Sequence, residues 1–128
     1  MVRSPALARA AAAVLALEGL ALIVFALIEL IGLGAGNAAS LPTALALIVL
    51  TLLGAAALIA FAVGANGGRS WARSGGIVFQ VLAVALALAS LTIQPVQWLF
   101  TLALGLPGAL GFALLVASAR AENARPTE

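Results

Sequence analysis

The sequence predicts an all-α membrane protein whose four transmembrane helices form an up-down-up-down bundle. Of its 128 residues, 65% are hydrophobic and only 8% are charged, whereas a soluble domain has about 25% charged residues. Residues 30–68 and 74–119 form two tracts without any charged side chain, and each is too long for one span of about 20 residues. All six basic residues are arginines that four spans would place on one side. They are Arg3, Arg9, Arg69, Arg73, Arg120 and Arg125.

These arginines also predict an orientation. Lys and Arg in short loops near span ends stay on the cytoplasmic side. Because four spans put all six arginines on one side, we expect a multi-pass protein of the bacterial inner membrane with both termini in the cytoplasm. Its first partner is the lipid bilayer. Nucleic-acid binding is not expected, because the arginines mark span ends and do not form one basic face with base-reading side chains.

The first two spans are expected at about residues 6–33 and 41–63. Pro42 lies in the first turn of the second span, where its missing N–H costs no helical hydrogen bond. Glycine-rich runs at 32–36 and 64–68 follow the apolar segments and are typical of helix ends.

The third span is expected at about residues 75–91, after a cytoplasmic loop over residues 69–74. The dipeptide Gln94-Pro95 predicts a tight external turn, because the residue before a proline is biased out of the helical region. Trp71 and Trp98 then fall at opposite membrane surfaces. Amphipathic indole rings favour that depth, so we interpret both as interface anchors.

The fourth span is expected at about residues 96–119, followed by a short polar cytoplasmic tail over 120–128. It contains Gly105, Pro107 and Gly108. A proline inside a helix removes one backbone hydrogen bond, so these residues predict a kink near the middle of the span.

Glu18 is the strongest functional signal, because it lies roughly a dozen residues into the first span, well inside the hydrocarbon. A carboxyl there is costly, so we expect it to be protonated and to face the bundle interior or a wet cavity. Gln80 enters the third span to a similar depth and is the expected hydrogen-bond partner. Two interpretations stay open: an interhelical bond of about 0.6 kcal/mol, or a proton- or cation-coupling site.

Glu29 follows Glu18 by eleven residues, which returns it to almost the same helix face about three turns later. It lies near the outer surface. It is either an interfacial carboxyl that reaches headgroups and water, or the outer mouth of a path that passes Glu18.

The composition removes most enzyme chemistry. The chain has neither Cys nor His, so it has no disulfide, no thiolate nucleophile and no imidazole base or metal ligand. Glu18 and Glu29 are about 16 Å apart along one helix, too far to flank one reacting bond. We therefore expect no enzymatic activity, no metal and no cofactor.

Two short stretches carry a resemblance to known proteins. Leu17-Glu18-Gly19-Leu20-Ala21, with residues 68–73 leading to Gln80, resembles small uncharacterised four-span membrane proteins of actinobacteria. The resemblance implies that Glu18 and Gln80 belong to one shared feature, and it brings no activity. In layout alone, the membrane-embedded Glu18 is also similar to small multidrug resistance transporters.

Two functions fit these observations. The first is a non-enzymatic accessory, scaffolding or assembly partner, which forms a homo-oligomer or joins a larger membrane complex. The alternative is a small proton-coupled transporter or channel that uses Glu18, with Gln80 and Glu29 along its path. We expect the first function, because the chain lacks most of the side chains that usually carry out chemistry and has no soluble domain.

Overall fold

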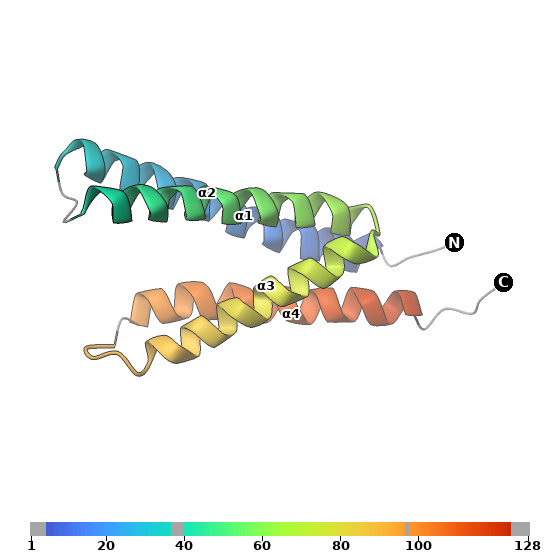
Figure 1. Ribbon diagram of the computed structural model, residues 1–128. Coiled ribbons are helices and arrows are strands. Elements are labelled where there is room, and N and C mark those ends of the chain that lie inside the picture. The colour runs from blue at the N-terminus through green and yellow to red at the C-terminus, as the bar shows by residue number, and fades with distance from the viewer. Residues whose placement is uncertain (1–4, 37–39, 97, 124–128) are drawn as a thin grey trace.

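The structure is a computed structural model that describes residues 5–36, 40–96 and 98–123. These residues form four helices and no strand (Figure 1). The helices are α1 (Pro5–Gly34), α2 (Leu41–Asn66), α3 (Ser70–Ser90) and α4 (Trp98–Asn123). Each is long and apolar enough to cross a membrane. The chain therefore has the make-up of a multi-pass, all-helical membrane protein. Arg3 and Arg125 lie outside the described residues.

Two helices differ from the expected spans at their ends. The prediction of a loop over residues 69–74 is largely wrong, because α3 already begins at Ser70. Gly68 has a φ of +78°, so the chain reverses at Gly68, before α3 begins at Ser70. Helix α4 begins two residues later than expected and includes residues 120–123 of the expected tail. Polar residues can continue a helix past the hydrocarbon, where hydropathy no longer marks its end.

Pro107 lies inside α4, and the helix continues across it. Its two glycine neighbours lie against α3. A Cβ atom added to Gly105 would be 3.1 Å from the Cβ of Ala87, and one added to Gly108 would be 3.1 Å from the Cβ of Ala83. These glycines allow α3 and α4 to approach closely, which is a common means of helix association in lipid. The kink itself stays a prediction.

The helices pack as two hairpins, α1 with α2 and α3 with α4. Further contacts between α1 and α4 and between α2 and α3 join the hairpins. In Figure 1 the hairpins lie close together at the end that holds the α2–α3 turn, and they diverge toward the other end. Helix α1 begins and helix α4 ends at the joined end.

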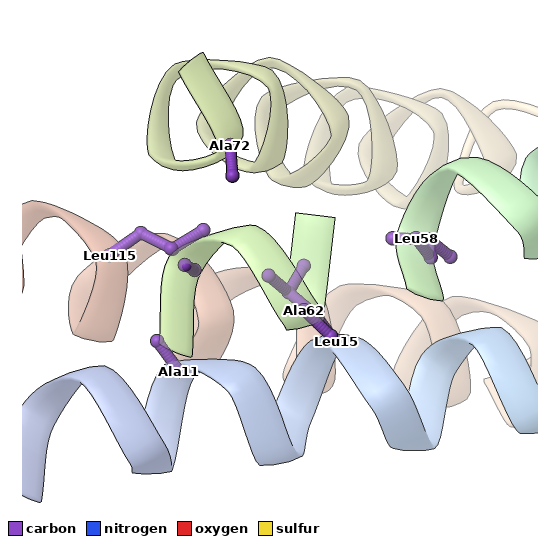
Figure 2. Close-up of a cluster of buried hydrophobic side chains, with 7 residues drawn as sticks. Ala11, Leu15, Leu58, Ala62, Ala72 and Leu115 are labelled. Atoms are coloured by element: carbon purple, nitrogen blue, oxygen red, sulfur yellow. The ribbon is translucent and has the colours of Figure 1, made fainter. Parts of the chain in front are cut away.

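A buried apolar cluster, to which all four helices contribute, holds the joined end together (Figure 2). Leu15 and Leu115 are fully buried in it, and the rest is mostly alanine. Small side chains let the backbones approach, so that dispersion contacts replace the hydrophobic effect that is missing between helices in lipid. The members are Ala11, Leu15, Leu58, Ala62, Ala65, Ala72 and Leu115.

Glycines and aromatic rings complete the contact between α2 and α3. A Cβ atom on Gly64 would overlap the side chain of Ala72, and one on Gly75 would overlap the ring of Phe61. Phe61 also packs edge-to-face on Trp71, with ring centroids 6.1 Å apart. The α2–α3 turn is therefore a packed part of the bundle, and it positions the residues that follow it.

Candidate functional site

Glu18 and Gln80 meet between the two hairpins. The Gln80 amide Nε2 donates a hydrogen bond of 2.7 Å to Glu18 Oε1. Glu18 is half-buried, whereas Gln80 is only 1% exposed. Glu18 lies about 20 Å along α1 from Pro5 at about 1.5 Å per residue. The hydrogen bond expected from the matching depths is thus present, and it connects α1 to α3.

The amide of Gln80 is held by close packing against α4. A Cβ atom added to Gly111 would lie 2.8 Å from Gln80 Cδ and 3.0 Å from its Oε1. Only a glycine leaves room for the amide at this position. Sequence reasoning did not connect Gly111 to Gln80. The signal available was the three-residue spacing of Gly108 and Gly111, which marks a face without naming the side chain that fills it.

One atom of this pair lacks a partner. Gln80 Oε1 is buried and accepts no hydrogen bond from any of the described residues. An unpartnered polar atom in a low-dielectric interior is costly, about 1–3 kcal/mol when a partner is removed. The site can therefore accept one further donor, either a small molecule such as water or the hydroxyl of a protonated carboxyl.

Glu18 also lines an apolar groove of about 380 Å³ between α1 and α4. Every other residue that lines it is apolar, so the carboxyl is the single polar group on its walls. The groove is open on one side and is not an enclosed polar channel. The apolar lining residues are Val14, Leu17, Ala21, Ala103, Leu106, Pro107 and Leu110.

Glu29 lies in a different environment. Thr51 Oγ1 of α2 is 3.2 Å from Glu29 Oε1 and 2.7 Å from the Leu47 carbonyl oxygen, and it can donate to either. Glu29 is half-buried and does not line the groove next to Glu18. The structure thus places the two carboxyls of α1 against different helices: Glu18 bonds across to the second hairpin, and Glu29 bonds within the first.

A second buried polar contact was not anticipated from the sequence. Ser90 Oγ donates to the Ala87 carbonyl oxygen at 2.6 Å and lies 2.6 Å from Thr101 Oγ1. Both residues are 8% exposed. Since the Ser90 proton is used on the carbonyl, the Thr101 hydroxyl donates to Ser90. The contact joins α3 to α4 beyond the region where the hairpins diverge.

The two tryptophans and the described arginines lie near helix ends. Trp71 lies in the first turn of α3 and Trp98 is the first residue of α4, and both are more than half exposed. Arg73 Nη1 donates to the Gly68 carbonyl oxygen at 3.1 Å. Arg9, Arg69, Arg73 and Arg120 each lie within about one helical turn of the joined end.

Nothing in the described part of the chain has the composition of a metal site, since no group of three or more His, Cys, Asp or Glu side chains comes together there. Comparisons of the chain with models of protein families, with curated proteins and with solved structures find no match. The geometry of Glu18, Gln80 and the groove is therefore the basis on which a function can be inferred.

Proposed function

We propose that the protein is a non-enzymatic, four-span protein of the bacterial inner membrane that acts as an accessory, scaffolding or assembly partner. Its helices would run up-down-up-down with both termini in the cytoplasm. Support comes from the arginine distribution and from the gathering of the arginine-bearing helix ends at one end of the molecule. The family of small four-span actinobacterial proteins that it resembles fits the same description.

The hydrogen bond between Glu18 and Gln80 carries this proposal. A carboxyl that is bonded to an amide of the other hairpin serves to hold two helix pairs together. The remaining surroundings of the carboxyl are apolar, and the adjoining groove offers no chain of polar groups along which protons could move. The same groove gives a partner helix a place to contact α1 and α4 together.

A second candidate function is a small proton-coupled transporter or channel. One observation favours it: Glu18 faces the groove, and its partner Gln80 retains an oxygen without a donor. A ligand with a hydrogen-bond donor could be held there. In this case the carboxyl would have to lose and regain its proton during each cycle.

Replacing Glu18 with glutamine separates the two functions. The amide side chain keeps a hydrogen-bonding group at the same position but cannot exchange a proton. An assembly partner with this change stays folded and retains its interactions, whereas a transporter loses proton-coupled flux in liposomes without losing stability. Loss of flux with unchanged unfolding behaviour would establish the second candidate and exclude the first.

Copurification in a mild detergent, followed by native mass determination, tests the first function directly. An assembly partner brings a second protein with it in a fixed ratio, both from cells that express the wild-type chain and from cells that express Glu18→Gln. A chain that is isolated only as a homodimer contradicts the role in a larger complex and strengthens the transport alternative.

A further inference from the structure

The arginines at the joined end form a positively charged surface that the proposed function does not use. Arg9 on α1, Arg69 and Arg73 at the start of α3, and Arg120 near the end of α4 lie at this end. Arg9, Arg69 and Arg120 are exposed, and Arg73 is half-buried. The only acidic residue within the described helix ends here is Glu122 of α4. Among the described residues of these helix ends, four arginines thus stand against one glutamate.

Two of these arginines are placed side by side. The Arg73 backbone N–H donates to the Arg69 carbonyl oxygen at 3.3 Å, so the two residues stand one helical turn apart, on one face of α3. The hydrogen bond from Arg73 to the Gly68 carbonyl holds its guanidinium next to the turn and on the side of Arg69. Two arginines that stand one turn apart at a helix end are close enough to reach the same phosphate, which arginine binds with paired N–H donors.

Trp71 fixes the depth of this pair. It lies between the two arginines in sequence, is 54% exposed, and is anchored by its edge-to-face contact with Phe61. Indole rings favour the headgroup level of a bilayer. In a bilayer this preference of Trp71 would hold the arginine pair at the level of the phospholipid phosphates, at the end of an apolar helix surface.

We propose that Arg69 and Arg73, at the same end of α3 as Trp71, bind the phosphate of an anionic phospholipid. A zwitterionic lipid has a phosphate too, but its positively charged choline or ethanolamine group opposes the field of the arginines. An anionic lipid has no such group. Each arginine near the surface contributes about fivefold in binding, so the pair gives about a 25-fold preference for the anionic lipid.

The two tryptophans make this measurable. In a Trp98→Phe background, Trp71 is the only tryptophan of the chain. Its fluorescence is measured in vesicles that contain increasing mole fractions of phosphatidylglycerol brominated in its acyl chains, or of phosphatidylcholine brominated in the same way. We expect Trp71 to be quenched at a mole fraction of phosphatidylglycerol about 25-fold lower than that of phosphatidylcholine. Equal quenching by both lipids would overturn the proposal.

Matched double variants separate a site from general attraction. Arg69→Gln with Arg73→Gln should remove the preference. Arg9→Gln with Arg120→Gln removes the same amount of charge from the same end of the molecule. This variant should keep most of the preference for the anionic lipid. Equal losses in the two double variants would mean diffuse attraction and contradict the site. If the first double variant does not insert, Arg69→Lys with Arg73→Lys keeps the charge and loses the paired donors. This variant should lose the preference for the anionic lipid several-fold. An unchanged preference would contradict the binding of phosphate by paired arginine donors.

Inorganic phosphate tests the source of the ligand. Added at an ionic strength matched with sodium chloride, it should reduce the quenching by phosphatidylglycerol no more than the chloride salt does. Stronger displacement by phosphate would show that the arginines bind a free anion, and the lipid proposal would then be wrong. None of these outcomes depends on whether the protein acts as an assembly partner or as a transporter.

Discussion

Replacing Gly111 with alanine tests whether the amide of Gln80 is held in place by α4. The new Cβ atom would lie 2.8 Å from Gln80 Cδ and 3.2 Å from its Cγ, closer than carbon atoms tolerate. Such overpacking costs about 1–3 kcal/mol. Displacing the amide also breaks its hydrogen bond to Glu18, which adds about 0.6 kcal/mol. Against this, alanine favours a helix over glycine by about 1 kcal/mol. The free energy of unfolding should therefore fall by about 0.5–2.5 kcal/mol.

A double-mutant cycle with Gln80→Ala isolates the contact. The Gln80→Ala change removes the three atoms nearest to the new methyl group, so in that background Gly111→Ala should be neutral or stabilising. The difference in helix propensity between alanine and glycine is the same in both backgrounds, so it cancels from the coupling energy. The coupling energy between the two positions is then about 1.5–3.5 kcal/mol, from the overpacking and the lost hydrogen bond together.

Unfolding by SDS titration in mild-detergent micelles measures these values. Gly34→Ala is the matched control, because a Cβ atom at Gly34 meets nothing within 4 Å. This control should leave the free energy of unfolding unchanged or raise it. A coupling energy below about 0.5 kcal/mol would fall within ordinary additivity, and it would refute the idea that α4 holds the amide.

Further predictions concern the other polar contacts and the orientation. Glu18→Leu leaves the Gln80 amide without its acceptor and should lower the free energy of unfolding by about 1–3 kcal/mol, whereas Glu18→Gln should stay within about 0.5 kcal/mol of wild type; equal losses in the same SDS titration would show that the hydrogen bond does not matter. Ser90→Ala removes the acceptor of the buried Thr101 hydroxyl and should cost about 1 kcal/mol, and adding Thr101→Val should restore part of it; a double variant less stable than both single variants would contradict this. The chain has no cysteine, so single cysteines in place of Ser70 and Thr92 report sidedness: a membrane-impermeant maleimide applied to intact spheroplasts should label only Thr92→Cys. Labelling of Ser70→Cys alone would reverse the proposed orientation.

Much of the architecture could be predicted because the lipid environment imposes strict rules on the sequence. Four long apolar segments were expected from the sequence, and all four helices are present. The pairing of Glu18 with Gln80 follows from counting residues from the same end of two helices. A buried carboxyl needs a partner inside the bundle, and only one amide lies at its depth in the expected spans.

The parts that were not predicted have two physical causes. In lipid the outer faces of the helices are as apolar as the inner ones, so the sequence has no polar face to show which side packs inward. The sequence therefore did not reveal that Gly111 faces Gln80, or that Ser90 meets Thr101. The helical residues 70–74 were assigned to a loop because Ser and Arg lowered the hydropathy there, although helical structure does not end where hydrocarbon ends.

The two carboxyls of α1 suggest how this small bundle divides its polar contacts. Glu29 lies next to Thr51 of its own hairpin, at the end where the hairpins have separated, so its loss should loosen only the pairing of α1 with α2. Glu18 bonds to the other hairpin just beyond the shared apolar cluster, where the hairpins begin to diverge. Breaking that bond removes a polar contact between the hairpins. The apolar cluster would then have to hold the hairpins together without it. Removing Glu18 should therefore change the angle between the hairpins, whereas removing Glu29 should not. Distances between spin labels on α2 and α4 near the diverging end measure that angle, and equal distance distributions for Glu18→Leu and wild type would show that the cluster alone sets it.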